Sequence, residues 1–265
     1  MNKKLKQKKK TIRHLDTTWL EHRPVNPKDI ILFLHGFPDT AHVWEKQLDR
    51  FATEDHIVVA PFSRGISQSA SSNQLHRYGT QAQCLDMREI LAEVDPSEKL
   101  PLWIVGHDLG VVYAWQCARF FGKRTQGLVV LNGMNLRQML LRMKNPVQLA
   151  KSWYVFLMQL PVIPEWLVSR MQDKITPEAA GGIQQYRAFA REMPALISNK
   201  PKRIKCPLLV IWGNNDPYLV SPTLDELEAE AANPVVRMLE SGHWVQKEKP
   251  NEVNKFIETF IGENL

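Results

Sequence analysis

The sequence predicts an α/β protein with a mostly parallel, twisted sheet that is flanked by helices and interrupted by an inserted helical cap. Short apolar runs of strand length alternate with segments of helical periodicity along most of the chain. Between residues 134 and 203 this alternation stops, and only helical patches separated by prolines remain. The chain has 265 residues, 44% of them apolar, which suffices for one large core with such an insertion.

The expected strands are unbroken apolar runs, which are typical of strands covered by helices on both faces. They lie at residues 30–34, 57–60, 102–105, 127–133 (strand plus turn) and 207–213, and a last strand is expected at 235–239. The polar residues 11–29 are expected to contain two short edge strands, one of them around residues 18–20.

Helical spacing of apolar residues predicts helices at 43–51, 78–94, 111–118, 224–231 and 252–261. The prolines that interrupt the helical insertion are Pro146, Pro161, Pro164, Pro177 and Pro194. We therefore divide the chain into a core, residues 11–134 and 204–265, and a helical cap, residues 135–203.

The first ten residues account for the basic character of the chain. The net charge is +6, and residues 1–10 contain six lysines and no acid, so the remainder carries no net charge. We expect residues 1–10 to form a disordered, solvated tail. Weak contact of this tail with an anionic membrane or with nucleic acid is the alternative, and no nucleic-acid partner is expected for the folded part.

Cysteine usage and hydropathy bound the compartment. Cys84, Cys117 and Cys206 are far apart in the sequence and form no CxxC pair or Cys/His cluster, so neither a disulfide framework nor a zinc site is predicted. No apolar stretch follows the basic start, as a secretory signal requires, and no run approaches the roughly 20 residues of a membrane helix. We expect a cytoplasmic protein.

Asp108 is the candidate nucleophile. It lies between Gly106 and Gly110, after an apolar strand and before an apolar helix. Glycines two positions to either side permit a sharp strand-to-helix turn, which raises the central side chain above the sheet. A carboxylate attacks carbon directly and needs no base to activate it. Taken alone, such a pentapeptide is more often a chance turn.

Two further polar side chains follow predicted strands. Asp216 comes after the strand at 207–213, and His243 after the strand at 235–239. Ligands of open α/β sheets bind beyond the carboxyl ends of the strands. A histidine base needs a carboxylate that fixes its tautomer, so we predict a triad of Asp108, Asp216 and His243. Taken singly, either of the last two residues is more often structural.

Together with His35–Gly36–Phe37–Pro38 after the first buried strand, these motifs resemble those of α/β-hydrolases with an aspartate nucleophile. That branch contains the epoxide hydrolases and the haloalkane dehalogenases. The resemblance extends from about Ile30 to Ile261 and implies the α/β-hydrolase fold. It also implies that the backbone N–H groups of Phe37 and Leu109 form an oxyanion hole. In epoxide hydrolases the Phe–Pro bond of this motif is often cis.

The cap segments around Tyr154 and Tyr186 resemble the two tyrosine segments of epoxide hydrolases. The resemblance implies that both hydroxyls hydrogen-bond the epoxide oxygen. Without it, the aromatic and aliphatic neighbours of Tyr154 indicate an ordinary packed helix with this tyrosine at its rim. The substrate pocket that the resemblance implies is lined by Phe37, Pro38, Leu109, Trp153 and Trp244.

The resemblance therefore implies a cofactor-independent, metal-independent epoxide hydrolase, which converts a small apolar epoxide and water into a vicinal diol. Asp108 forms an alkyl ester, and His243, oriented by Asp216, activates the water that cleaves it. The first alternative is a haloalkane dehalogenase-like hydrolase. Those enzymes typically carry Trp after the nucleophile and often Asn after His–Gly, where this chain has Leu109 and Phe37.

Two further points bear on this choice. Epoxide hydrolases also usually carry Trp at the Leu109 position, so the wall of the pocket and the substrate range differ from those of typical members. A second alternative is a non-catalytic hydrolase fold that only binds a small ligand. The complete triad argues against that alternative, because a binding module needs none of it.

Overall fold

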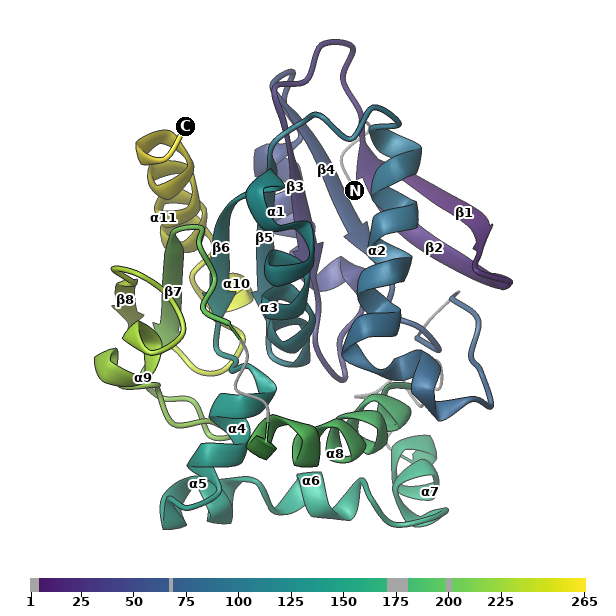
Figure 1. Cartoon of the computed structure of the whole chain (residues 1–265), viewed down its shortest axis with the longest axis vertical. Helices are drawn as coiled ribbons and strands as arrows, with labels where there is room; N and C mark the ends of the chain where they lie inside the picture. The colour runs from purple at the N-terminus through teal and green to yellow at the C-terminus, as the bar shows by residue number, and fades with distance from the viewer. Residues whose placement is uncertain (1–4, 67–68, 171–180, 199–201) are drawn as a thin grey trace.

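An eight-stranded sheet forms the core of the computed structural model, which describes residues 5–66, 69–170, 181–198 and 202–265 (Figure 1). The strand order is β1-β2-β4-β3-β5-β6-β7-β8, in which β1, β2 and β4 pair antiparallel and all other neighbours pair in parallel. The strands are β1 (Lys6–Ile12), β2 (Leu15–His22), β3 (Asp29–Leu34), β4 (His56–Pro61), β5 (Leu102–His107), β6 (Thr125–Leu131), β7 (Leu208–Gly213) and β8 (Val235–Leu239). The predicted fold class is confirmed.

Helices cover both faces of this sheet. One face packs against α2 and α3, and the other against η1, α1, α10 and α11. The core helices and 3₁₀ turns are η1 (Ala41–Trp44), α1 (Glu45–Phe51), η2 (Leu75–Tyr78), α2 (Thr80–Val94), α3 (Leu109–Phe121), η3 (Gly122–Arg124), α9 (Leu224–Glu228), α10 (Val245–Glu248) and α11 (Pro250–Glu263). Within β3, Ile30 and Leu32 point to one layer and Ile31 and Phe33 to the other. This alternation explains why the strand is apolar throughout.

The chain between β6 and β7 leaves the sheet and runs beyond the carboxyl ends of the parallel strands (Figure 1). Its described residues form α4 (Leu136–Arg142), α5 (Pro146–Lys151), α6 (Trp153–Leu157), α7 (Ile163–Arg170) and α8 (Ile183–Ser198), with no strand among them. This is the region expected to form a helical cap. Pro177 and the other residues of 171–180, with residues 199–201, lie outside the described part. Among the described helices, none is long and apolar enough to cross a membrane.

Residues 6–10 correct the expectation of a disordered tail. They belong to β1, which pairs with β2 from Lys6 opposite Glu21 to Ile12 opposite Leu15. The prediction for residues 1–10 is therefore wrong over this part, while residues 1–4 lie outside the description. The lysine side chains are exposed, and the pairing is made by the backbone, so no apolar alternation marks the strand. Lysines on an edge strand discourage pairing with another chain.

The three cysteines are buried free thiols. Cys84 on α2 and Cys117 on α3 lie with their Sγ atoms 3.0 Å apart in the interface between these helices. Burial and the neighbouring sulfur raise the pKa of the Cys117 thiol well above its ordinary value. These thiols therefore act as small apolar groups of the core.

Candidate active site

Asp108 occupies a strained turn between β5 and α3. Its backbone angles are φ 53° and ψ −124°, a conformation that residues with a side chain rarely adopt. Close packing explains the flanking glycines: a Cβ on Gly110 would lie 2.1 Å from the carbonyl oxygen of Leu34. A Cβ on Gly106 would lie 2.8 Å from the Cβ atom of Ala114. The turn thus holds the Asp108 side chain at the carboxyl edge of the sheet, 9% exposed.

Two backbone N–H groups hold the Asp108 carboxylate. The N–H of Phe37 donates to Oδ1 at 2.9 Å, and the N–H of Leu109 also donates to this carboxylate. The Phe37–Pro38 peptide bond is cis. Burial alone would raise the pKa of Asp108, but the hydrogen bond and charge of His243, with the N–H of Leu109, lower it below its ordinary value. Asp108 is therefore an anion at neutral pH.

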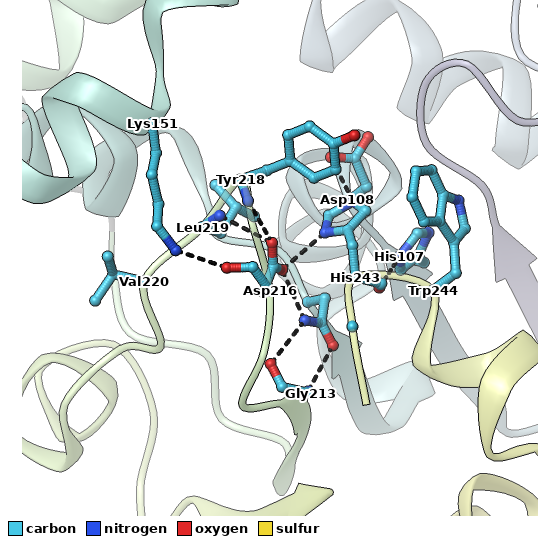
Figure 2. Close-up of polar contacts among 12 residues, drawn as sticks. His107, Asp108, Lys151, Gly213, Asp216, Tyr218, Leu219, Val220, His243 and Trp244 are labelled. Atoms are coloured by element: carbon cyan, nitrogen blue, oxygen red, sulfur yellow. Dashed lines mark hydrogen bonds and ion pairs between the residues drawn. The ribbon is translucent and has the colours of Figure 1, made fainter. Parts of the chain in front are cut away.

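His243 connects the two carboxylates of the predicted triad (Figure 2). Its Nδ1 lies 2.7 Å from Oδ2 of Asp216, and its Nε2 lies 3.4 Å from Oδ2 of Asp108. Burial alone would lower the pKa of His243, but both carboxylates raise it to about 10. In the resting site the imidazole is thus protonated, and Oδ2 of Asp108 is the oxygen that faces it.

Hydrogen bonds from several parts of the chain fix Asp216. Its Oδ2 accepts a hydrogen bond from Nδ2 of Asn132 at 2.7 Å, and its Oδ1 accepts the N–H groups of Tyr218 and Leu219 at 2.7 and 3.0 Å. Lys151 of the cap donates to the carbonyl oxygen of Asp216 at 2.6 Å. Burial would raise the pKa of Asp216, but the bonds from His243, Asn132 and the Tyr218 N–H lower it. Asp216 thus remains a charged, oriented acceptor.

Sequence reasoning assigned no role to Asn132 or Lys151. Asn132 follows β6 directly, and its Oδ1 accepts the N–H of Gly213 at the end of the neighbouring β7. Its position after a buried strand was the available signal, because polar residues there reach the carboxyl edge of the sheet. Lys151 lies in the middle of the cap segment, and no sequence pattern relates it to Asp216.

A second group of polar side chains lies next to His243. Nε2 of His107 lies 2.9 Å from the carbonyl oxygen of His243, and burial with the nearby His243 charge lowers the pKa of His107 to about 3. His107 is therefore neutral and donates through Nε2. The indole N–H of Trp244 donates to Oδ2 of Asp39 at 2.8 Å. Burial raises the pKa of Asp39 to about 6.

His35 fixes the loop that carries the Phe37 N–H. Its Nε2 accepts the N–H of Ser63 at 3.0 Å, so its Nδ1 carries the proton and donates to the carbonyl oxygen of Gly36 at 2.8 Å. Burial lowers its pKa to about 4, so this tautomer persists at neutral pH. A Cβ on Gly36 would lie 2.3 Å from Oδ1 of Asp108, which explains the glycine.

The two cap tyrosines form one aromatic group with the triad. Tyr154 of α6 and Tyr186 of α8 have ring centroids 6.2 Å apart, and Tyr186 lies 5.6 Å from Phe37. Tyr218 links them to the core, at 5.9 Å from Tyr154 and 5.1 Å from His243. Burial, with the charge of Asp108, raises the pKa of both cap tyrosines. Both hydroxyls are therefore protonated donors on the cap side of the site.

The residues expected to line the pocket fall into two groups. Phe37 and Leu109 donate to the Asp108 carboxylate through their N–H groups, Pro38 follows directly, and Trp244 lies 5.1 Å from His243 between ring centroids. Trp153 is 65% exposed on the outer side of the cap. It lines an open surface hollow of about 640 Å³ together with Tyr218, so it borders the site from outside rather than enclosing it.

The donor set at this centre does not resemble a metal site. Within the described ranges, no group of three or more His, Cys, Asp or Glu side chains could hold a metal ion. The triad side chains instead contact one another directly. The arrangement can attack an electrophilic carbon with Asp108, hold negative charge on Oδ1, and move a proton at Nε2 of His243.

This fold, with an acid on the elbow and a histidine after the last strand, defines a class of protein. Residues 31–256 match the sequence profile of the alpha/beta hydrolase family. The chain belongs to this family, as its motifs predicted.

Individual similar proteins carry a more specific name, epoxide hydrolase. The chain is 28% identical over 271 residues to epoxide hydrolase 3 of Xenopus tropicalis, which covers 89% of this chain and 72% of that protein. It is 28% identical over 276 residues to epoxide hydrolase 4 of Homo sapiens, covering 89% of this chain and 73% of that protein. The crystal structure of the Bacillus megaterium epoxide hydrolase with an inhibitor has a TM-score of 0.80 at 24% identity, over 96% of this chain and 100% of that chain. That structural likeness shows the shared fold.

Proposed function

We propose that this protein is an epoxide hydrolase, which adds water to a small apolar epoxide and releases a vicinal diol. One observation carries the proposal: an aspartate lies on the elbow, 3.4 Å from His243, and its charge, together with burial, raises the pKa of two adjoining cap tyrosines. An epoxide needs a nucleophile for one carbon and proton donors for its oxygen, and this site offers both. The names of the Xenopus and human relatives support the same activity.

The first step is alkylation of Asp108. Because Oδ1 is held by the Phe37 N–H, Oδ2 is the oxygen free to attack. A bond forms between Oδ2 and a ring carbon while the bond from that carbon to the ring oxygen breaks. Tyr154 and Tyr186 hydrogen-bond the ring oxygen, which gains negative charge as the ring opens. The product of this step is an ester on Asp108 that bears an alkoxide.

Loss of the Asp108 charge then changes the role of His243. Its pKa is about 10 because two carboxylates face it, and the ester leaves only Asp216. The imidazolium therefore gives up its proton, which neutralises the alkoxide, and His243 becomes a base. The alkoxide thus acquires its proton without any outside acid.

The second step is hydrolysis of the ester. Nε2 of His243 takes a proton from water, and the resulting hydroxide attacks Cγ of Asp108. Oδ1 then carries the oxyanion, held by the N–H groups of Phe37 and Leu109. Cleavage of the bond between Cγ and the ester oxygen releases the diol, whose leaving oxygen receives the proton of the hydroxyl group that was added to Cγ. This transfer restores the Asp108 carboxylate beside a protonated His243.

The dehalogenase alternative lacks halide donors in this site. The side chains of Phe37 and Leu109 have no polar hydrogen, and the indole N–H of Trp244 is bonded to Asp39. A halide leaving from the substrate would therefore find the tyrosine hydroxyls and no indole donor. A haloalkane dehalogenase-like activity thus remains the weaker alternative.

A parallel assay tests the proposal. Purified protein is incubated with aryl and alkyl epoxides and, separately, with haloalkanes, and diol formation and halide release are measured. We expect diol from at least one epoxide and no halide above the level of the Asp108→Ala variant. Halide release without diol formation would establish the alternative. Neither product, with ligand binding confirmed, would favour the non-catalytic fold.

A further inference from the structure

The outer side of the cap carries most of the exposed large apolar side chains of the described residues. Nine of fifteen such side chains lie between residues 141 and 166. They are Leu141, Val147, Leu149, Trp153, Phe156, Leu160, Val162, Ile163 and Trp166, here called the apolar cap face. Figure 1 shows α5, α6 and α7 in a row on the side of α8 away from the sheet. Scattered apolar side chains are normal on a surface, but this concentration on one segment is not.

Among the described residues, nothing covers the outward side of helix α6. Tyr154 and Val155 pack toward the core cluster, as expected for an inner face. Trp153 and Phe156, on the same helix, are 65% and 55% exposed. A helix at a protein surface normally turns polar residues outward. An outward face with two large aromatic rings therefore indicates a partner.

The charges around this face are basic. From residue 136 to residue 170 the only acid is Glu165, which pairs with Arg187 at 2.6 Å. Lys144 and Arg170 are exposed at either end of the face, and the guanidinium of Arg170 lies 4.5 Å from the ring centre of Trp166. An apolar surface bordered by cations is complementary to a lipid bilayer with anionic headgroups.

We propose that the apolar cap face docks on an anionic lipid membrane surface, with Trp153, Phe156 and Trp166 at the level of the headgroups. Tryptophan is enriched at this depth, because its ring is apolar while its N–H remains near water. A second copy of the chain is the less suitable occupant. A twofold interface brings the same patch of both copies together, so Lys144 and Arg170 would face like charges in a common rim.

Docking in this orientation would bring the site close to the membrane. Trp153 and Val147 line the surface hollow that also contains Tyr218, and Tyr218 lies 5.1 Å from His243 between ring centroids. An apolar epoxide dissolved in the bilayer would then reach the enzyme at the edge of its site. This consequence rests on the proposed function, whereas the docking itself does not.

Vesicle flotation tests the docking without any substrate. Full-length protein is mixed with vesicles of phosphatidylcholine, or of phosphatidylcholine with phosphatidylserine, and the floated fraction is measured. We expect binding that is stronger with phosphatidylserine. The triple variant Trp153→Gln, Phe156→Gln, Trp166→Gln should lower the partition coefficient at least tenfold. The matched variant Val25→Gln, Phe120→Gln, Leu265→Gln also removes three exposed apolar side chains, but outside the cap, and should bind like the wild type.

Two further measurements keep the test decisive. If circular dichroism shows that the triple variant is unfolded, a second variant replaces it. The double variant Lys144→Gln, Arg170→Gln should remove the preference for phosphatidylserine. Brominated phosphatidylcholine should quench the fluorescence of the wild-type protein, since Trp153 and Trp166 are the most exposed of the eight tryptophans. Absence of both quenching and flotation overturns the proposal.

Other occupants give different results. A dimer in sedimentation velocity that the triple variant dissociates, without vesicle binding by the wild type, would assign the face to a second copy. Binding that is lost on replacing the β1 residues Lys6, Lys8 and Lys10 by Gln, and kept in the triple variant, would assign membrane contact to that strand instead. Either result overturns docking through the cap. If the wild-type protein floats with the vesicles but hydrolyses no epoxide, only the proposed function is refuted.

Discussion

The rings of Tyr154 and Tyr186 meet edge to face, with their planes at 88° and their centroids 6.2 Å apart. They come from different cap helices, α6 and α8, and burial and the Asp108 charge keep both hydroxyls protonated. In the proposed mechanism, this pair supplies two donors for the epoxide oxygen. The pair therefore tests epoxide opening separately from other chemistry on the same triad.

The double variant Tyr154→Phe, Tyr186→Phe should therefore be nearly inactive on epoxides. Each lost donor to developing charge costs about 2–4 kcal/mol, or roughly 30- to 1000-fold in rate. One tyrosine partly substitutes for the other, so single variants should lose less than the pair. The measurement is the rate of Asp108 alkylation in a single turnover, with circular dichroism to confirm folding.

Tyr113→Phe is the matched control for the tyrosines. Its hydroxyl is also buried but donates to the carbonyl oxygen of Tyr78, inside the core. Its alkylation rate should stay close to that of the wild type. If the double cap variant also alkylates at the wild-type rate, the two cap tyrosines only pack, and their assigned role is wrong.

His243→Gln should trap the intermediate. Alkylation needs Asp108 and the tyrosines, whereas hydrolysis needs a base at Nε2, which glutamine lacks. Intact-mass spectrometry after mixing with substrate should show the protein plus one substrate mass. Asp108→Ala, treated in the same way, should show no adduct. An unmodified His243→Gln mass, with substrate binding confirmed by a separate measurement, would contradict the two-step mechanism.

The main features of the fold were predictable because buried parallel strands are apolar on both sides. The predicted strands at 30–34 and 207–213 correspond to β3 and β7 within a residue. Strand β1 was missed, because its side chains from Lys6 to Thr11 are exposed on both faces, so no apolar alternation marks its pairing with β2. The predicted helix at 224–231 ends at Glu228, where the backbone continues in turns.

The candidate site likewise has residues that the sequence could predict and contacts that it could not. Asp108, Asp216 and His243 could be placed from chain order, since each follows a strand that ends at the same edge of the sheet. The contacts of Asn132 and Lys151 with Asp216 join segments distant in sequence, and no local pattern encodes them. The outward direction of Trp153 was also hidden, because α6 is apolar on both sides and periodicity cannot distinguish them.

Gly36→Ala should strongly lower activity while the protein remains folded. The added Cβ would lie 2.3 Å from Oδ1 of Asp108, so the carboxylate must move out of the hydrogen bond with Phe37. We expect kcat to fall at least about 100-fold, the typical cost of one oxyanion-hole donor. Gly262→Ala is the matched control, since its Cβ would meet nothing within 4 Å. Equal activity of the two variants would show that the loop adapts and that this geometry is not required.

The pKa of His243 should fall when the charge of Asp108 is removed. Asp108→Asn imitates the loss of charge in the ester, so the pKa of His243, about 10 in the resting site, should drop by a unit or more. The measurement is the pH titration of ¹⁵N-labelled histidine by NMR. An unchanged pKa would mean that Asp108 does not control the base.

The raised pKa of His243 also predicts how the free energy of unfolding changes with pH. The folded pKa of about 10 lies above the ordinary value of 6.5, so the stabilisation by this group is complete below about pH 6.5. It is lost as the pH rises towards 10. Wild-type protein should therefore lose more free energy of unfolding between pH 7 and 10 than Asp108→Asn does, in matched urea titrations. A larger loss in the variant would contradict this assignment.

Deletion of residues 1–10 should leave catalysis intact and weaken the fold. None of the described residues 5–10 contacts the triad, so turnover of a small soluble epoxide should stay within about twofold, less than 0.5 kcal/mol in the barrier. The deletion removes Leu5, which is 5% exposed, and the part of β1 from Lys6 to Lys10 that pairs with β2. Each kcal/mol lost should lower Tm by about 2–4 °C at this chain length. A tenfold loss of turnover in a folded truncation would show that this strand supports the site.

A full-length control separates strand pairing from charge. Replacing Lys6, Lys8, Lys9 and Lys10 by Thr keeps the backbone ladder with β2 but removes the cations from the edge of the sheet. This variant should keep its Tm, since threonine suits a strand, yet aggregate faster because the edge has lost its charges. The truncation should show both effects, because β2 then becomes the open edge. Light scattering at a temperature below both Tm values measures aggregation, and equal rates for wild type and the Thr variant would show that the lysines do not protect this edge.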